Sequence, residues 1–174
     1  MVQLIGEASS EVIATLARSW VGTRYHHQAH KKGVGCDCIG LIIGVWEELF
    51  SGRVPKDFVL PAYTPHWGDE SGEFNVMAEY CNRYLIPLPL VWRSNGPADQ
   101  LRAGDVILWR MLRKGATKHA GILTGPNSMV HAYYGHDVME TPLIQKAGSQ
   151  LTFAFRFPGN WRDDDDNKVA GVGE

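Results

Sequence analysis

Hydrophobic residues recur at helical spacing in the first part of the chain and at strand spacing after Gly104. Apolar residues three and four positions apart are typical of a helix with one buried face. This spacing predicts helices over residues 7–20, 38–50 and 73–84. Beyond Gly104, short apolar runs alternate with glycine-containing turns, which indicates strands. The predicted strands cover residues 105–109, 119–124, 129–133, 138–141 and 151–157.

Helices that precede an antiparallel sheet of about five strands indicate the α+β class, with the helices packed on the sheet. The chain has 174 residues, which favours a single domain, and we expect that domain to cover residues 1–160. Prolines punctuate residues 51–100, so we expect a long, lid-like insert of irregular structure there. The acidic stretch 161–174 is predicted to be a disordered tail.

The first predicted helix has a polar start and an apolar face. Ser9 or Ser10 is expected to cap it, because a serine side chain accepts a hydrogen bond from the backbone of the first turn. The residues expected to be buried are Val12, Ile13, Leu16, Ala17 and Trp20.

A thiol stands at the start of the second predicted helix. Glycines break the structure just before it, so Cys38 falls in the first helical turn with Asp37 at the capping position. The positive end of a helix dipole favours a thiolate, which makes Cys38 a candidate nucleophile. The alternative is a buried structural thiol, which behaves as a small hydrophobic residue.

Two histidines are placed to act on such a nucleophile. His119 opens one predicted strand and His131 lies in the next, with a turn at 125–128 between them. An antiparallel hairpin brings both imidazoles onto neighbouring strands. His119 is thus the candidate general base for Cys38, and His131 is the candidate partner that holds His119 in the correct tautomer. Structural histidines within the strands are the alternative.

Composition narrows the classes of function. Hydrophobic residues make up 44% of the chain, and the formal net charge is −2 with no long basic block. This balance argues against nucleic acid as the main partner. No apolar run reaches about 18 residues, so we expect no membrane insertion. The first residues lack a basic start with an apolar core, so we expect synthesis in the cytoplasm without a signal peptide.

The remaining cysteines and histidines give weaker signals. Three cysteines cannot all pair within one chain, which indicates a reducing environment. Cys36 is expected to be a packed or loop thiol, with protection of Cys38 against oxidation as the alternative. His26, His27 and His30 have lysine neighbours and no Cys-x2-Cys pair nearby, so we expect no metal and no cofactor.

Five short motifs follow one another along the chain. They are Gly22-Thr23-Arg24-Tyr25, Asp37-Cys38-Ile39-Gly40-Leu41, Gly104-Asp105-Val106, His119-Ala120-Gly121-Ile122 and His131-Ala132. In this order they resemble the motifs of NlpC-type cysteine peptidases, a family of cell-wall hydrolases with a papain-like fold. The resemblance extends over about residues 7–157, and it is strongest to the branch found in phages and gene transfer agents.

This resemblance implies roles for individual residues. Cys38 attacks a peptide carbonyl in bacterial peptidoglycan, His119 is the base, and His131 orients His119. Tyr25 and Asp37 line the site, and the Cys38 backbone N–H donates to the oxyanion. The family's usual substrate is the peptidoglycan stem peptide, cut between D-glutamate and a diamino acid. The branch implies a component of a phage or prophage-derived particle that contacts other tail proteins and acts at the cell wall.

One residue departs from the family motif. Many members carry a serine after the nucleophile, where it helps hold the free amino end of the stem peptide, whereas this chain has Ile39. An isoleucine side chain forms no hydrogen bond, so the peptide end that binds and the bond that is cut stay open. Two other functions also stay open: an amidase or acyltransferase on the same fold, and a non-catalytic wall-binding tail module.

Overall fold

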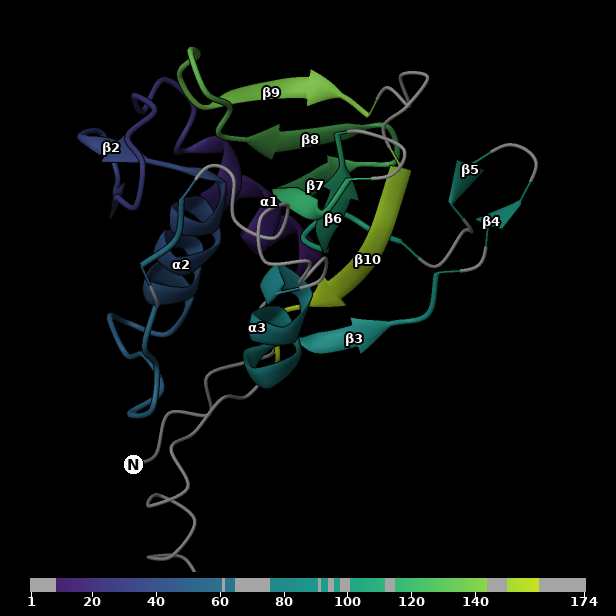
Figure 1. Ribbon diagram of the computed structural model, residues 1–174, viewed down its shortest axis with the longest axis horizontal. Coiled ribbons are helices and arrows are strands. Elements are labelled where there is room, and N and C mark those ends of the chain that lie inside the picture. The colour runs from purple at the N-terminus through teal and green to yellow at the C-terminus, as the bar shows by residue number, and fades with distance from the viewer. Residues whose placement is uncertain are drawn as a thin grey trace, which may run out of the picture.

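A computed structural model gives the structure of the protein (Figure 1). It describes residues 9–60, 62–64, 76–90, 92–93, 96–97, 101–111, 115–143 and 150–159. The predicted tail 161–174 lies outside the described residues, as do residues 7–8 and 73–75, with which two of the predicted helices begin. Within the described part of the chain, no helix is long and apolar enough to cross a membrane.

The three predicted helices are confirmed, with shorter bounds. They are α1 (Ser10–Arg18), α2 (Cys38–Leu49) and α3 (Val76–Tyr84). Ser9 caps α1, because its Oγ accepts a hydrogen bond from the Val12 backbone N–H at 3.2 Å. The Val12 side chain itself is 48% exposed, so its predicted burial was wrong. Successive residues turn by about 100°, and the buried stripe of α1 is centred on Ile13 and Ala17, which leaves Val12 beside it.

The strands form a six-stranded antiparallel sheet in the order β3-β10-β6-β7-β8-β9. In Figure 1 this order runs from β9 at the top to β3 at the bottom. The bounds are β3 (Ile86–Leu88), β6 (Val106–Arg110), β7 (Thr117–Gly125), β8 (Ser128–His131), β9 (Met139–Pro142) and β10 (Gln150–Arg156). The five predicted strands are confirmed, and the α+β class with them.

The sequence interpretation missed the sixth strand, β3. It has only three residues, and Pro87 at its centre has no backbone N–H to donate. Proline is tolerated on an edge strand, where one side of the backbone needs no partner. β3 is such a strand, because it pairs with β10 alone and places Pro87 opposite Phe155.

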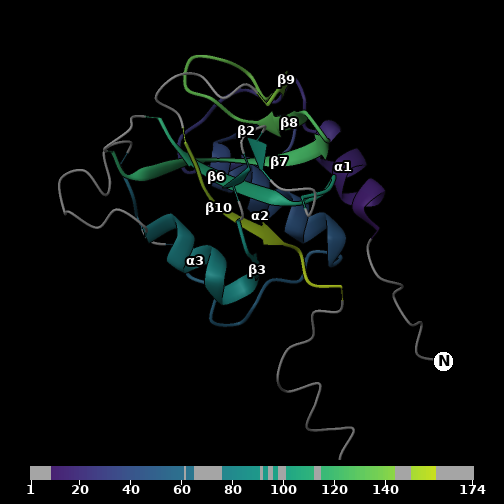
Figure 2. The same cartoon turned by 90° about the vertical axis from the view of Figure 1, so that its right-hand side faces the viewer.

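Two small antiparallel pairs complete the described elements. β1 (His30–Lys31) pairs with β2 (Gly35–Cys36) just before α2, and β4 (Trp92–Arg93) pairs with β5 (Gly96–Pro97). Figure 2 shows α1 and α3 on opposite sides of the view with α2 between them. The predicted insert 51–100 therefore contains α3, the edge strand β3 and a short hairpin within its described residues.

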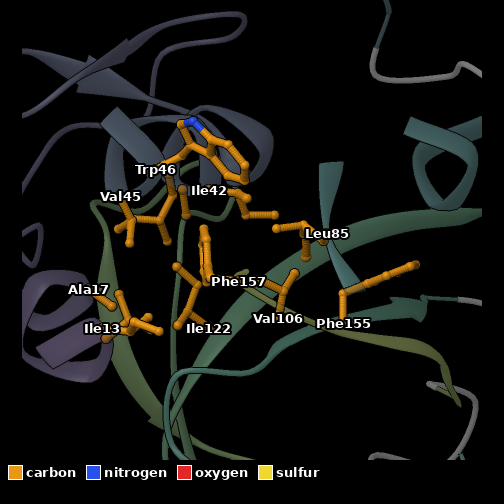
Figure 3. Packing of buried hydrophobic residues seen from close by; sticks show 14 of the residues in the cluster. Ile13, Ala17, Ile42, Val45, Trp46, Leu85, Val106, Ile122, Phe155 and Phe157 are labelled. Carbon is orange, nitrogen blue, oxygen red and sulfur yellow. The ribbon is translucent and has the colours of Figure 1, made fainter. Parts of the chain in front are cut away.

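One face of the sheet forms the main hydrophobic core with the helices. Figure 3 shows Trp46 and Ile42 of α2 above Phe157, with Ile122 of β7 and Val106 of β6 below it. These side chains belong to one buried cluster that also includes Ile13 and Ala17 of α1. The opposite face carries a smaller cluster around Ile107 and Trp109. Alternate residues of β6 thus serve the two faces, as the period of a strand requires.

A buried ion pair holds the start of β6. Asp105 is 1% exposed, and its carboxylate accepts hydrogen bonds from Arg156 Nε at 2.8 Å and Arg156 Nη2 at 2.9 Å. The Arg102 backbone N–H donates to the same carboxylate at 2.9 Å. A buried carboxylate is tolerated only with such partners. The Gly104-Asp105 motif is therefore explained by packing, since Asp105 joins β6 to β10.

Candidate active site

Cys38 is the first residue of α2, and Asp37 is its N-cap, as predicted. One carboxylate oxygen of Asp37 accepts a hydrogen bond from the Gly40 backbone N–H at 2.8 Å. This satisfies one of the backbone donors that a helix start leaves unpaired. Asp37 is 2% exposed, so its side chain fixes the first turn of α2 from within the protein.

Two glycines explain how closely α2 approaches its neighbours. A Cβ atom at Gly40 would lie 1.9 Å from the Ala29 carbonyl oxygen, and one at Gly44 would lie 2.1 Å from the Trp20 ring. No other residue fits at either distance without a shift of the surrounding chain. The backbone of residues 26–30 therefore lies directly against the first turn of α2, where it holds the segment that carries Cys38.

The Cys38 thiol lies beside the backbone of β7. Its Sγ atom is 4.0 Å from the Lys118 carbonyl oxygen, and the Ala120 N–H also interacts with it. β8 pairs with β7 only from Ile122 onward, so it leaves this stretch of β7 uncovered on that side. The thiol therefore interacts with the backbone of the two residues that flank His119 in β7, and Cys38 and His119 line the same cavity.

The two candidate histidines are hydrogen-bonded to each other. His119 Nε2 and His131 Nδ1 are 2.9 Å apart, and His131 Nε2 is 3.1 Å from Thr141 Oγ1 on β9. His119 and His131 are 6% and 9% exposed. The hairpin prediction is thus confirmed: pairing of Ile122 with Val130 sets the imidazoles on neighbouring strands. A chain of three polar side chains crosses β7, β8 and β9.

The hydrogen bonds define the tautomers that a base at His119 needs. If His119 carries its proton on Nε2, it donates to His131 Nδ1 and leaves its own Nδ1 free to accept a proton. His131 then carries its proton on Nε2 and donates to Thr141 Oγ1. In this assignment both imidazole N–H groups have an acceptor within the chain His119–His131–Thr141.

Aromatic rings hold His119 in place. The Trp109 ring lies edge-on to the imidazole with centroids 4.3 Å apart, and the Tyr133 ring lies at 5.4 Å. Gly121 provides the space for this arrangement, because a Cβ there would lie 3.3 Å from His131 Cβ and 3.4 Å from the Trp109 ring. Trp109 was not singled out from the sequence. Its position opposite His119 depends on the β6–β7 register.

The second carboxylate oxygen of Asp37 holds two further segments. It accepts hydrogen bonds from the Gln28 backbone N–H at 2.7 Å and from the Tyr63 hydroxyl. The Tyr63 carbonyl oxygen is in turn 2.8 Å from His27 Nε2 and 2.7 Å from Gln28 Nε2. Tyr63 is a site residue that sequence reasoning missed. The only signal was the proline-rich segment around it, which predicted a wall or lid without naming a residue.

A cavity of about 180 Å³, here called the site cavity, brings the candidates together. Its walls include Cys38, His119, Tyr25 and Asp37, all of which the sequence placed at the site. Tyr63 and Thr64 of the insert form another part of the wall. His131 is not among the residues that line the cavity, and its hydrogen bond to His119 connects it to one that does. The described part of the insert therefore borders the site.

Burial governs the protonation of both reacting groups. Burial and the adjacent Asp37 raise the pKa of the Cys38 thiol to about 12, although backbone N–H groups at Ala120, Ile39 and Cys38 act to lower it. Burial and His131 lower the pKa of His119 to about 3. The raised pKa of Cys38 therefore favours a neutral thiol in the resting protein over the expected thiolate. The helix terminus favours negative charge at Cys38, but desolvation outweighs it.

Cys36 stays apart from this chemistry, whereas His27 of the histidine loop lines the site cavity and places its Nδ1 atom 3.5 Å from Asp37 Oδ2. Cys36 is fully buried in the main core, and burial raises the pKa of its thiol to about 12. This favours the packed-thiol interpretation. Among the described residues, no group of three or more His, Cys, Asp or Glu side chains is placed to hold a metal ion.

The sequence model of the NlpC/P60 family matches residues 22–156, so the chain belongs to the NlpC/P60 family. The matched range contains all of the candidate site residues. A comparison with curated protein sequences gave no match.

Solved structures show the same papain-like fold. The NlpC/p60 domain of the peptidoglycan hydrolase SagA is 21% identical with a TM-score of 0.53, over 86% of this chain and 99% of that one. NlpC2 from Trichomonas vaginalis is 16% identical with a TM-score of 0.54, over 90% of this chain and 48% of that one. An NlpC/P60 protein from Bacillus cereus ATCC 10987 is 17% identical with a TM-score of 0.56, over 88% and 41%. The chain thus spans about half the length of the two Trichomonas vaginalis proteins, at 48% and 46%.

Proposed function

We propose that this protein hydrolyses an amide bond in the stem peptide of peptidoglycan, with Cys38 as nucleophile, His119 as base and His131 as the residue that orients His119. The observation that carries the proposal is that Cys38 and His119 line one cavity while His119 Nε2 lies 2.9 Å from His131 Nδ1. Membership of the NlpC/P60 family supports the reaction class, and the SagA domain is a peptidoglycan hydrolase of the same fold.

The chemistry starts from a neutral pair. Because the pKa of Cys38 is raised to about 12 and that of His119 is lowered to about 3, thiol and imidazole are both uncharged near neutral pH. We infer that the Sγ proton passes to His119 Nδ1 as Sγ attacks the carbonyl carbon, so that charge forms only with substrate present. The backbone N–H groups at the start of α2 are placed to stabilise the developing oxyanion.

The rest of the cycle follows from the same groups. The tetrahedral intermediate collapses when the C–N bond breaks and His119 gives its proton to the leaving amine. A thioester remains on Cys38. His119 then takes a proton from water, the hydroxide oxygen attacks the thioester carbon, and the C–S bond breaks. The carboxylic product leaves, and the proton returns to the Cys38 sulfur.

The bond cut is proposed to be the D-glutamyl–diamino acid amide, the usual target of the family. Ile39 qualifies this proposal, because its side chain offers no hydrogen bond where many family members have a serine hydroxyl. Asp37 does not replace that hydroxyl simply, since its two oxygens already accept from Gly40, Gln28 and Tyr63. The way in which the stem peptide is held therefore differs from that of serine-bearing members.

The proposal is tested by digestion of purified muropeptides with the wild-type chain and Cys38→Ala, with products read by mass spectrometry. A fragment pair cut beside D-glutamate, formed by the wild type and absent with Cys38→Ala, is the expected result. Cys36→Ser is the matched control, because it changes a thiol that does not line the site cavity and should keep most activity. A chelator should leave the rate unchanged. Product formation by Cys38→Ala would refute the nucleophile assignment.

Absence of cleavage by a folded wild-type chain would favour the two other functions. An amidase or acyltransferase would form an acyl-enzyme at Cys38 with other amides or esters, detectable as a mass increase on that residue. A wall-binding tail module would retain peptidoglycan in a pull-down without a covalent product.

We also propose that the protein is a component of a phage or prophage-derived particle that carries it to the cell wall. The support is the likeness of the motif Asp37-Cys38-Ile39-Gly40-Leu41 to the branch with an aliphatic residue after the nucleophile. The test is co-purification with induced particles through a density gradient. Recovery in the soluble fraction alone would contradict this placement and leave the hydrolase proposal intact.

A further inference from the structure

A second cavity lies between α2 and α3, next to the site cavity. Its volume is about 70 Å³, and it is lined almost wholly by apolar atoms. One wall is a stripe along α2 formed by Ile39, Ile42, Ile43 and Trp46. The facing wall comes from α3 and includes Met77 and Cys81, and residues 54–60 supply the third side. It is called the apolar cavity below.

The stripe along α2 sets the direction in which the apolar cavity extends. Its four residues follow the spacing of one helical face, from Ile39 in the first turn to Trp46 seven residues later. A helix rises 1.5 Å per residue, so the stripe extends about 10 Å away from the nucleophile. A cavity of this kind suits a narrow, extended apolar group better than a compact or charged one, because a charge there would lose its hydration without gaining a partner.

The apolar cavity adjoins the site cavity. Ile39 and Met77 line both of them. Ile39 follows Cys38 directly in the chain, so its side chain stands at the boundary beside the nucleophile. A molecule that places a carbonyl at the Cys38 sulfur therefore has only the apolar side chains of this shared boundary, among them Ile39 and Met77, between it and the space between α2 and α3.

We propose that the apolar cavity is a subsite of the active site that takes an unbranched aliphatic chain of the substrate, attached close to the carbonyl that Cys38 attacks. This inference rests on the proposed function in one respect, namely that Cys38 is the reacting group. It gives Ile39 a positive role: an isoleucine keeps the boundary between the cavities apolar, whereas a serine hydroxyl would interrupt it. Ile39 and Met77 are then residues that select for the aliphatic chain.

The test uses alkylation of Cys38, which needs neither the natural substrate nor hydrolysis. A series of N-alkyl iodoacetamides, from methyl to octyl, reacts with the full chain at one pH; an S–C bond forms, iodide leaves and the thiol proton is released. Peptide mass spectrometry counts adducts on Cys38 separately from those on Cys36 and Cys81. Each rate is divided by the rate for the same reagent with the urea-unfolded chain, which removes intrinsic reagent differences.

The normalised rate should rise with chain length and level off once the cavity is filled. Burial of one methylene contributes about 0.8 kcal/mol, so the upper bound is about fourfold for each added carbon. We expect the hexyl reagent to react at least about tenfold faster than the methyl reagent, well within that bound. Equal normalised rates for methyl and hexyl reagents would overturn the proposal, and this result needs no variant.

Two substitutions of Cys81, a residue in the wall of the apolar cavity, should have opposite effects on the chain-length profile. Cys81→Leu adds bulk to the cavity and should remove most of the advantage of the hexyl reagent over the methyl reagent. Cys81→Ala enlarges the cavity and should move the plateau to longer chains. Val12→Leu is the control, because Val12 is 48% exposed on α1, and it should leave the profile unchanged. A full hexyl advantage in folded Cys81→Leu would also overturn the proposal.

The two proposals fail separately. A rising chain-length profile without muropeptide cleavage would support the subsite and refute the proposed wall substrate. Muropeptide cleavage with a flat profile would support the hydrolase and overturn the subsite.

Discussion

The two ends of the site are built in different ways. On one side, the start of α2 lies against residues 26–30 and β7 through backbone contacts so close that a Cβ at Gly40 would be 1.9 Å from a carbonyl oxygen. On the other side, α2 and α3 meet through side chains and leave a cavity of about 70 Å³. Backbone contacts of the first kind tolerate one residue type, whereas side-chain packing of the second kind accepts many.

This contrast separates the elements that position Cys38 and His119 from those that select the substrate. The nucleophile and base are placed mainly by elements outside the insert: the cap at Asp37, the close contact at Gly40 and the β7–β8 register. The one described contact of the insert with them is the hydrogen bond from Tyr63 to Asp37. The insert contributes Tyr63 to one wall and α3 to another. A chain of this kind can change what it binds through the insert without displacing Cys38 from His119.

The largest expected effect is at the base. His119→Ala removes the group that accepts the Sγ proton, so kcat/KM for muropeptide cleavage should fall by a factor of about 10³ or more. The substitution leaves a hole beside Trp109 and removes the partner of His131 Nδ1, so the fold is checked by circular dichroism. His131→Ala is the companion variant, and it should lose less, because it acts only through the orientation of His119. An equal loss from both would show that His131 has a more direct part.

The next largest expected effect is the pH dependence of the reactivity of Cys38. With its pKa raised to about 12, the thiolate fraction of Cys38 should rise about tenfold for each pH unit from 6 to 10, and so should its rate with iodoacetamide. The rate of an ordinary cysteine levels off above about pH 8.5. The cysteines of the urea-unfolded chain provide this profile as the control. A plateau below pH 8 in the folded protein would instead indicate a thiolate–imidazolium pair at rest.

Stability should depend more on the buried ion pair at the start of β6 than on an exposed ion pair. Asp105→Ala leaves Arg156 without the carboxylate that it contacts at 2.8 Å, and breaking such a pair costs about 3 kcal/mol of unfolding free energy. We place the loss at the lower end because the Arg156 side chain is 26% exposed and regains some hydration. Urea denaturation measures it. Glu140→Ala, at an exposed ion pair with Arg18, is the comparison and should cost under about 1 kcal/mol.

Features that depend on local periodicity could be predicted from the sequence, whereas contacts between distant segments could not. Helical spacing and the turn at 125–128 were enough for three helices, five strands and the juxtaposition of His119 with His131, because each depends on local periodicity. β3 was missed because three residues around a proline carry no periodic signal. Tyr63 was missed because its contact with Asp37 joins residues 26 positions apart through an irregular segment. The raised pKa of Cys38 depends on burial, which a motif does not report.

The smallest expected effect tests whether the insert supports the site. Tyr63→Phe keeps the ring but removes the hydroxyl that donates to Asp37, while Gln28 and Gly40 still donate to the carboxylate. One hydrogen bond to a carboxylate with other donors left should change the unfolding free energy by about 1 kcal/mol. If Tyr63 positions the wall of the site cavity, KM for muropeptides should rise severalfold with kcat nearly unchanged. Tyr84→Phe is the matched control, because its hydroxyl donates to the Asp57 carbonyl oxygen at 3.4 Å and interacts with Arg83, away from Asp37. A fall in kcat for Tyr63→Phe, with KM unchanged, would mean that the insert acts on the nucleophile through Asp37, and the separation of position from selectivity would not hold.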